Sequence, residues 1–367
     1  MKSIDYFTNV YSHYRAPLWK LLIDSKEVRF NFFFSKKEFK GIEISKYNES
    51  LRLKPRLVNI SLFGKIIWQL GVVNSSIKSK ADGLMFLGEM NLISTWVSIL
   101  ICKVKNKKVF LWGHGIYGNE SYLKMKLRLI FLNLADINFL YGNHAKSILL
   151  ENGFKKEKIQ VIYNSIPSTS MNKGYGENTN NNDMKTYEMF SDDILFVGRL
   201  TRVKKIELLF QAFEKAKKIN SKLRLFVIGT GKIRSKLEKN FSHLNKSIFF
   251  LGAIYNEKIL EHYISNAALL VSPGNVGLAC IHSLSYGTPV CTHNNMSFQM
   301  PEAEALDEKN SILFEMDDVD SLVDSILRGV TLKKKQNTSK YCKESVLKNF
   351  TPENQYRLMI DKINQVL

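Results

Sequence analysis

Proline, cysteine and acidic side chains are all scarce in this chain of 367 residues. Seven prolines and four cysteines exclude collagen-like, proline-rich and disulfide-stapled classes of protein. No apolar run reaches the ~20 residues of a membrane-spanning helix, and the nearest, 84–102, is interrupted by Glu89 and Asn91. The start, MKSIDYFTNV, has no apolar core of signal-peptide length. We therefore expect a cytoplasmic protein.

Metal-binding patterns are also missing. The cysteines Cys102, Cys280, Cys291 and Cys342 stand far apart without metal-ligand spacing, so we expect reduced thiols. Two acidic pairs stand at 192–193 and 317–318, but neither has a partner cluster of ligands, and one lies at a strand entrance, away from the expected ligand edge. We interpret both pairs as surface carboxylates and predict no metal site.

The shortage of acids leaves the chain strongly basic. Lys and Arg total 53 against 34 acids, a net charge of +19. Residues 1–165 hold 26 basic and 12 acidic side chains, and residues 166–367 hold 27 and 22. The excess in the first part favours an anionic partner, either a phosphorylated substrate, an acidic membrane surface or nucleic acid. An evenly solvated lysine-rich surface is the alternative. We do not expect nucleic acid, because no nucleic-acid-binding motif is present.

The chain is too long for one hydrophobic core, since single cores stop growing near ~250–300 residues. Residues 166–191 are rich in Ser, Asn and Gly and almost free of aliphatic side chains, as a linker should be. This segment predicts one domain over 1–165 and a second over 192–350.

Strand and helix patterns alternate after the linker. Apolar strand-like runs at 194–197, 224–228, 248–251, 268–271 and 289–292 enclose helical patterns at 205–219, 233–240, 257–265 and 278–286. Repeated βα units with apolar strands predict a parallel sheet that is covered on both faces. The first part fits the same plan less clearly, with strands expected at 30–34, 109–112, 137–141 and 159–163. We predict an α/β protein with two doubly wound domains and a cleft between them.

Ligands of such sheets bind beyond the carboxyl ends of the strands, so the loops there are the candidate sites. Loop 198–204 leaves a strand and contains Gly198, Arg199 and Lys204. A glycine, two cations and a helix N-terminus suit a diphosphate. Two surface bases near a turn are the alternative.

Loop 272–277 follows another strand and leads into the helix that carries His282. The amides of 276–279 are expected to be exposed and to bind phosphate or sugar oxygens. A lone histidine on an apolar helix is more often structural, so His282 alone decides nothing.

Two further glycine-rich loops follow strands. His114 lies between Gly113 and Gly115, and we expect these glycines to leave it unshielded for a ligand, unless the histidine is incidental to a turn. The 229–231 run, Gly-Thr-Gly, also follows a strand. Because residue 234 is arginine, the dinucleotide fingerprint is incomplete and no nicotinamide cofactor is implied.

The order of these loops resembles a known family. FVGRLTRVKK, LRLFVIGTGK, the run IFFLGAIYNEK to SLSYGTPV, and NSILFEMDDVDSLVDSI look like the C-terminal domain of family 4 retaining glycosyltransferases. The resemblance covers about 190–330, and HGIYG with IQVIYNSI matches the N-terminal domain more loosely. It implies the GT-B fold, in which two Rossmann-like domains face a central cleft. The N-terminal domain would bind the acceptor, and the last segment, 351–367, would be a helix that crosses back to it.

The resemblance also implies roles for individual residues. Arg199 and Lys204 match the pair that binds the donor diphosphate, and His114 matches the histidine that approaches the donor sugar; we take these three as catalytic. The donor-binding residues would be Gly198, Gly274, Asn275, Val276, Gly277, Leu278 and His282. The acceptor side would include Tyr14, Arg15, Gly113 and Gly115.

Three positions depart from the family pattern. Gly274 and His282 stand where the family usually carries two glutamates, the first near the donor sugar and the second on the ribose. Histidine can still hydrogen-bond a ribose hydroxyl, whereas the missing first carboxylate leaves the donor sugar open. Lys205 replaces a usual glycine, which is a milder difference.

The resemblance implies a retaining, metal-independent glycosyltransferase that uses a UDP- or GDP-sugar and no other cofactor. The expected acceptor is a lipid-linked or oligosaccharide glycan of bacterial polysaccharide, capsule or O-antigen synthesis. Another GT-B enzyme, such as a nucleotide-sugar epimerase or hydrolase, and a catalytically silent binding subunit are the alternatives.

A basic amphipathic segment favours peripheral contact with the anionic inner face of the cell membrane. Residues 121–135 combine Lys124, Lys126 and Arg128 with apolar side chains, and such a helix can lie in a membrane interface. A helix that packs Leu127, Ile130, Phe131 and Leu134 into the core is the alternative.

Overall fold

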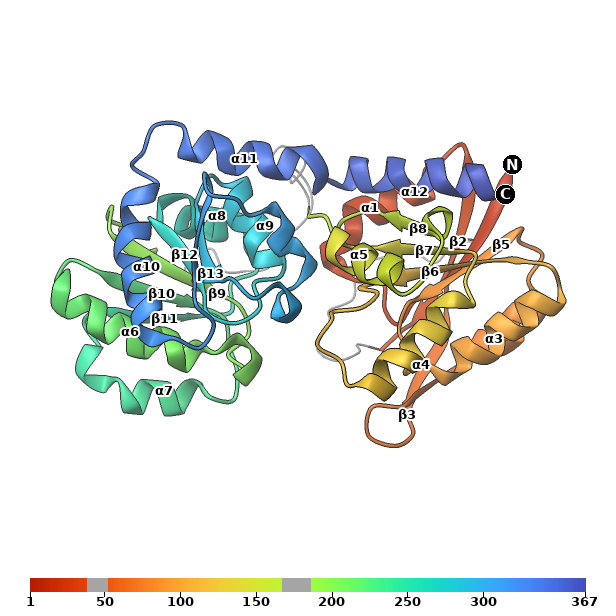
Figure 1. Ribbon diagram of the computed structural model, residues 1–367, viewed down its shortest axis with the longest axis horizontal. Helices are drawn as coiled ribbons and strands as arrows, with labels where there is room; N and C mark the ends of the chain where they lie inside the picture. Colours follow the sequence, from red (N-terminus) through yellow and green to blue (C-terminus); the bar gives the residue numbers. More distant parts are fainter. Residues whose placement is uncertain (38–51, 167–185) are drawn as a thin grey trace. The chain divides into compact units, whose positions relative to one another are not determined.

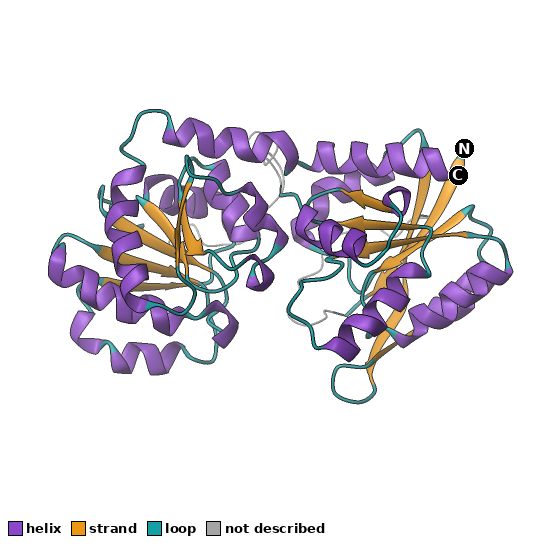
Figure 2. Cartoon of the chain, in the orientation of Figure 1, coloured by secondary structure: helices purple, strands orange, loops and turns teal. Residues whose placement is uncertain are grey.

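The computed structural model describes residues 1–37, 52–166 and 186–367. The chain divides into two compact units (Figures 1 and 2): Met1–Pro167 with Thr351–Leu367 form unit 1, and Ser168–Phe350 form unit 2. Most of the predicted linker, 167–185, lies outside the described residues. Each unit has its own sheet and is described by itself.

Unit 1 is built on an eight-stranded sheet in the order β4-β3-β2-β1-β5-β6-β7-β8. Only the β3–β4 pair is antiparallel. The strands are β1 (Lys2–Phe7), β2 (Val28–Ser35), β3 (Leu53–Ser61), β4 (Ile67–Leu70), β5 (Gly83–Leu87), β6 (Lys108–Gly113), β7 (Ile137–Leu140) and β8 (Ile159–Val161).

Two hydrophobic cores cover the two faces of this sheet, because successive strand side chains point to opposite sides. Ile4 and Tyr6 belong to one core and Phe7 to the other. The helices of unit 1 are α1 (Ala16–Ile23), α2 (Val72–Lys78), α3 (Ile93–Val104), α4 (Tyr122–Asn133), α5 (Asn143–Glu151) and α12 (Pro352–Val366), with short 3₁₀ turns η1 (His13–Arg15) and η2 (Lys156–Lys158).

Helix α12 comes from the far end of the chain and packs in the first core of unit 1. The Thr351 side chain accepts a hydrogen bond from the Asn354 amide, and Pro352 occupies the first turn, so the start of the helix is well defined. Met359, Ile360 and Ile363 are fully buried there. Burying each such side chain contributes roughly 1.5–3 kcal/mol, which is enough to hold the segment in place.

Unit 2 contains a six-stranded, entirely parallel sheet in the order β11-β10-β9-β12-β13-β14. The strands are β9 (Asp193–Val197), β10 (Arg224–Ile228), β11 (Ile248–Gly252), β12 (Leu269–Ser272), β13 (Val290–His293) and β14 (Ser311–Phe314). The strand order reverses between β9 and β12, as it does between β1 and β5 in unit 1. In doubly wound sheets, ligands bind beyond the carboxyl ends of the strands at such a reversal.

The helices of unit 2 cover both faces of its sheet. They are α6 (Ile206–Ile219), α7 (Arg234–Asn240), α8 (Glu257–Asn266), α9 (Leu278–Ser285), α10 (Val319–Leu332) and α11 (Thr338–Asn349), with 3₁₀ turns η3 (Arg202–Lys204), η4 (Ser242–Leu244), η5 (Met296–Phe298) and η6 (Pro301–Ala305). The predicted strands and helices of this unit agree with these bounds to within about two residues. The prediction of two doubly wound α/β domains is confirmed.

One minor prediction is wrong. Asp193 is not a surface carboxylate: it is fully buried, and Arg224 donates to both of its oxygens, at 2.7 and 2.5 Å. Its neighbour Asp192 pairs with Lys334 at 2.8 Å. All four cysteines are free and buried. Within the described ranges, no helix is long and apolar enough to span a bilayer, and no cluster of three potential metal ligands occurs.

Candidate functional site

Two loops of unit 2 meet where its strand order reverses. One is 198–204, which follows β9, and the other is 273–277, which follows β12. They touch because residue 274 is glycine: a Cβ there would lie 2.1 Å from the Val203 carbonyl oxygen and 2.7 Å from Lys204 Cα. Any larger residue would have to push the backbones apart. Glycine at 274, where the family usually carries a glutamate, is therefore required by the close contact of the two loops.

The Gly-Thr-Gly run after β10 supports the same loop from the other side. A Cβ on Gly229 would lie 1.9 Å from the Gly198 carbonyl oxygen, and one on Gly231 would lie 2.1 Å from that of Leu200. The amides of Gly198 and Leu200 donate to the carbonyls of Ile228 and Thr230, both at 2.9 Å. These glycines serve close packing of two loops.

Lys204 lies beneath the junction of the loops. Its ammonium donates to the Asn275 carbonyl at 2.5 Å, and a Cβ on Gly277 would be 3.8 Å from the same nitrogen. Burial lowers the pKa of Lys204 to about 8; the charge of Glu302 opposes this shift and that of Arg199 adds to it. Arg199 itself is exposed to solvent. Of the two cations predicted to bind the diphosphate, Lys204 is thus half-buried and Arg199 is exposed.

The start of α9 is only partly available to a ligand. The Val276 amide is buried and donates to Gln299 Oε1 at 2.9 Å, so the prediction that it is exposed is wrong. Gln299 in turn donates to Thr292 Oγ1 and the His293 carbonyl, at 2.8 and 2.9 Å. Gln299 therefore fixes the loop before α9. The following amides, of 277–279, open the helix and have no partner within it.

His282 lies on α9 beside a carboxylate from another helix. Its Nε2 is 3.8 Å from Glu257 Oε1, and the Tyr286 hydroxyl donates to the same oxygen at 2.6 Å. Burial lowers the pKa of His282, and the charge of Glu257 partly opposes this. A quarter of the His282 side chain and almost a third of the Glu257 side chain are exposed. A carboxylate at the start of α8 thus lies beside the histidine of α9.

Lys205 shows why its position usually carries glycine. Its φ is +48°, in the left-handed region, which costs a residue with a side chain about 1–2 kcal/mol. The Lys205 ammonium pairs with Asp317 at 2.5 Å and offsets part of this cost.

In unit 1, His114 follows β6 and packs between two tyrosines. Its ring centroid is 4.8 Å from that of Tyr141 and 5.5 Å from that of Tyr117. The expectation that flanking glycines leave it unshielded is wrong. Gly115 instead has φ +69°, and a Cβ there would lie 2.8 Å from the Leu140 side chain; Gly113 packs against Gly88. Burial, with the charges of Arg15 and Arg128, lowers the pKa of His114 to about 3.

Arg15 lies in the same cluster, inside a cage of aromatic rings. Its guanidinium carbon is 4.7 Å from the Trp112 ring centroid, 5.3 Å from that of Tyr14 and 5.5 Å from that of Tyr141. The guanidinium donates to the Tyr141 hydroxyl. Within the described part of the chain, four buried polar atoms of this cluster have no hydrogen-bond partner: Arg15 Nε, Tyr6 Oη, Trp112 Nε1 and His114 Nδ1. Unpaired buried groups are costly, so such a group is typical of a site that a ligand completes.

The loop after His114 is organised by Arg128 of α4. This guanidinium donates to the Gly115 carbonyl at 2.7 Å and lies 3.3 Å from Glu120, which accepts from the amides of Tyr117 and Gly118. Only 14% of the Arg128 side chain is exposed. Arg128 therefore positions the loop and is not available to a membrane surface.

The structure thus gathers the predicted residues into two groups. The donor group lies in unit 2, and Tyr14, Arg15 and His114 share one aromatic cluster in unit 1. Gln299, Glu302 and Glu257 were missed by sequence reasoning. The first two follow β13, the strand beside β12, so the rule on carboxyl ends of strands would have found them. Glu257 carried no signal, because its distance from His282 depends on how α8 packs beside α9.

Known proteins resemble both parts of the chain. Residues 191–331 match the family model "Glycosyl transferases group 1". Two uncharacterized glycosyltransferases of Methanocaldococcus jannaschii, MJ1607 and MJ1059, are 31% and 26% identical over 37% and 43% of this chain. The aligned segments span only 36% and 39% of those relatives.

Solved structures match the whole chain. The apo form of the lipopolysaccharide outer core galactosyltransferase WaaB has a TM-score of 0.68 at 16% identity, and HepE of Anabaena in complex with UDP has 0.66 at 12%. Both matches cover all of this chain and all of the other. At such identities the likeness shows the fold alone: the chain has the GT-B fold. Its second unit carries the sequence pattern of glycosyl transferases group 1.

Proposed function

We propose that this protein is a retaining glycosyltransferase that moves a sugar from a nucleotide-sugar to a glycan acceptor. The observation that carries the proposal is the junction of loops 198–204 and 273–277, where Gly274 lets Lys204 reach under the start of α9. The group 1 match over 191–331 covers the same loops.

Unit 2 would bind the donor. Arg199 and Lys204 would neutralise the diphosphate, with Gly198 allowing close approach and the amides of 277–279 adding donors. As the bond from the sugar to the diphosphate breaks, these cations would stabilise the negative charge that develops on the leaving group. A departing phosphate oxygen would take the acceptor proton on the same face. We propose that no metal is needed, because two cations and helix amides already oppose this charge.

The nucleoside would be held by two residues in place of the usual glutamate. Glu257 presents a carboxylate and His282 a largely neutral imidazole next to each other on α8 and α9. A ribose has two adjacent hydroxyls, which such an acceptor pair can bind. HepE has been crystallised with UDP and with UDP-glucose, and we propose a UDP- or GDP-sugar for this chain.

Unit 1 would supply the acceptor side. His114, which the family resemblance places near the donor sugar, would be neutral at physiological pH because its pKa is about 3, so it would hydrogen-bond that sugar and not act as a general acid. Tyr14, Arg15, Gly113 and Gly115 would line the acceptor site. The unpaired Arg15 Nε and His114 Nδ1 would find their partners in bound substrate.

We further propose a lipid-linked acceptor, presented at the inner face of the cell membrane during polysaccharide, capsule or O-antigen synthesis. Helix α4 leaves Tyr122, Leu123, Leu127 and Ile130 more than half exposed, while Phe131 is buried. The predicted core-facing alternative therefore holds only for part of the helix. Lys124 and Lys126 are exposed on the same helix. Apolar side chains with adjacent cations suit an anionic bilayer surface.

The test is a panel of UDP-, GDP- and dTDP-sugars, with binding measured by thermal shift and transfer measured with membrane extract as the acceptor source. We expect one nucleotide class to raise the melting temperature, and Arg199→Ala and Lys204→Ala to abolish most turnover in proteins that still fold. Near-normal turnover in both variants would refute the assignment. Nucleotide binding without any transfer would favour the silent binding subunit, which the replacements at Gly274 and His282 make the second candidate.

A further inference from the structure

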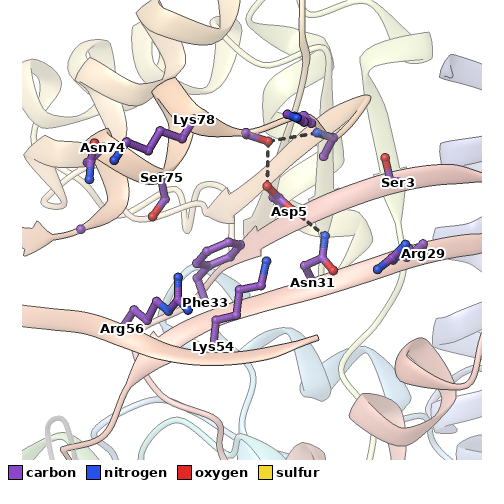
Figure 3. Close-up of a pocket in the computed structure, with 14 residues that line it drawn as sticks. Ser3, Asp5, Arg29, Asn31, Phe33, Lys54, Arg56, Asn74, Ser75 and Lys78 are labelled. Atoms are coloured by element: carbon purple, nitrogen blue, oxygen red, sulfur yellow. Dashed lines mark hydrogen bonds between the residues drawn. The ribbon is translucent and has the colours of Figure 1, made fainter. Parts of the chain in front are cut away.

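A polar pocket lies in unit 1, over the sheet and beside α2 (Figure 3). Its volume is about 590 Å³, within the ~300–1,000 Å³ typical of small-molecule sites. Its walls come from β1, β2 and β3, from α2 and from the segment that leads into β5. Five of the lining side chains are cations: Arg29, Lys54, Arg56, Lys78 and Lys80.

The register of the strands explains why polar groups gather here. Ser3 pairs with Arg29 and Asp5 with Asn31 across the parallel β1–β2 ladder, so these four side chains share one face of the sheet. The intervening Ile4 points to the opposite face, into the first core. The polar face is continued by Lys54 of β3, and Figure 3 shows Lys78 and Ser75 of α2 across the opening.

The charges of this pocket are poorly balanced. Asp5 is the only acid among the described residues of its lining. Asp5 is 5% exposed, and its oxygens accept from Asn31 Nδ2 and Ser79 Oγ, both at 2.7 Å. Among the ion pairs between described residues, none includes any of the five cations. Lys54 instead lies 4.8 Å from the centroid of the Phe33 ring.

One further acid, Asp82, stands close to the pocket but is already engaged. It accepts from both the amide and the hydroxyl of Ser3, each at 2.8 Å. Hydrogen bonding from Ser3 lowers the pKa of Asp82, so its carboxylate stays ionised beside the start of β1. The described lining residues, five cations and one acid, carry a net charge of +4, and the nearby Asp82 lowers the local charge to about +3.

The pocket is separate from the candidate acceptor side of the same unit. Ser3 and Arg29 are the second residues of their strands, and Ala81 precedes β5, so this is the amino-terminal end of the sheet. His114 and Arg15 follow the carboxyl ends of β6 and β1. A ligand bound here would not compete with an acceptor bound there.

We propose that this pocket binds a ligand carrying two phosphate groups. Two phosphates carry roughly −3 to −4 at neutral pH, which matches the net charge of the lining. Arg29 and Arg56 can each bind a phosphate in the bidentate manner of guanidinium groups, and the lysines act as point charges. Asn74 and Ser75, which also line the pocket, can hydrogen-bond hydroxyls on the rest of the ligand. The phosphates can belong to a soluble sugar bisphosphate or to a lipid headgroup.

The test uses isothermal titration with fructose bisphosphate and with inorganic pyrophosphate on the full chain. Because the donor site also attracts phosphates, the titrations are done on the Arg199→Ala/Lys204→Ala protein. The pocket variant adds Arg29→Gln, Arg56→Gln and Lys78→Gln. The matched control adds Lys20→Gln, Lys26→Gln and Lys155→Gln, which removes three exposed charges of unit 1 outside the pocket. Unchanged melting temperatures show that the variants fold.

We expect the Arg199→Ala/Lys204→Ala protein, here the donor-site variant, and the matched control to bind at least one probe with the same affinity. We expect the pocket variant to bind that probe at least tenfold more weakly. Equal affinity in all three proteins, or no binding of the donor-site variant to either the soluble probes or the phosphoinositide vesicles, overturns the proposal. A second arm uses phosphatidylcholine vesicles with and without a phosphoinositide bisphosphate. Binding that depends on this lipid and on the three pocket residues assigns the phosphates to a headgroup, and binding of the soluble probe alone assigns them to a sugar. Neither result depends on the glycosyltransferase activity.

Discussion

Replacing Gly274 by alanine adds one methyl group at the contact between the two loops of the candidate donor site. The new Cβ would lie 2.1 Å from the Val203 carbonyl oxygen and 2.7 Å from Lys204 Cα. Both are backbone atoms, so no side chain can rotate away, and one of the two loops must move by more than an ångström to reach ordinary contact. That movement would break the 2.5 Å hydrogen bond from Lys204 to Asn275.

Forcing an extra carbon into a packed site costs typically 1–3 kcal/mol. For a unit of this size, each kcal/mol lowers the melting temperature by ~2–4 °C. We therefore expect Gly274→Ala to lower the melting temperature of unit 2 by a few degrees, and to weaken donor binding and turnover at least tenfold, because Lys204 no longer sits below the loop. Differential scanning calorimetry and a transfer assay with the identified donor measure the two effects.

Gly252→Ala is the matched control in the same unit. Its φ is +75°, and a Cβ there meets only the Arg234 guanidinium, at 3.9 Å. This change carries backbone strain of about 1–2 kcal/mol without touching either loop, so it should lower stability and leave donor affinity unchanged. The reasoning fails if Gly274→Ala keeps both the stability and the donor affinity of the original protein.

Three further predictions concern charge. Because the pKa of Lys204 is about 8 and its charged form is the active one, kcat/KM should fall as the pH rises through about 8. In the Lys204→Arg variant this fall should move to higher pH, since arginine stays protonated. A fall at the same pH in the variant would exclude Lys204 as its source. Glu257→Gln should weaken nucleotide binding about tenfold while Tyr286→Phe changes it little, and equal effects would mean that Glu257 acts only through Tyr286. Lys124→Glu with Lys126→Glu should abolish cosedimentation with anionic liposomes at low salt, and unchanged cosedimentation would exclude α4 as the docking surface.

The sequence predicted the fold of unit 2 well because each βα unit signals itself locally. An apolar strand, a glycine at its end and a helix with one apolar face, such as Ile206 to Ala216 in α6, are all visible within about 25 residues. The sheet order then follows from the few arrangements that parallel units can adopt. In unit 1 the antiparallel β3–β4 hairpin was not expected, because its strands are joined by the five-residue loop 62–66 and not by a two-residue Asn-Gly or Asp-Gly turn.

Only part of the candidate site could be predicted from the sequence, and the reason is physical. Arg199, Lys204 and His282 are polar residues placed after strands or at helix starts, where the topology alone brings side chains together. The position of Glu257 relative to His282 depends on how α8 packs beside α9, and local sequence patterns do not predict the distance between two packed helices. The same holds for Arg128. Its charge suggested a membrane contact, but its guanidinium donates to the Gly115 carbonyl and so fixes the loop after β6.

Gly274 and His282 stand where the family resemblance predicts two glutamates, and the surroundings of the two positions differ. At position 282, Glu257 can supply the carboxylate that the family pattern predicts, because α8 places Glu257 Oε1 3.8 Å from His282 Nε2. At position 274 no such replacement is available, because the space that a side chain would need is filled by the backbone of Val203 and Lys204. The first change should therefore preserve nucleotide binding. The second brings loop 198–204 close to the start of α9 and leaves the recognition of the donor sugar to groups other than a side chain at 274.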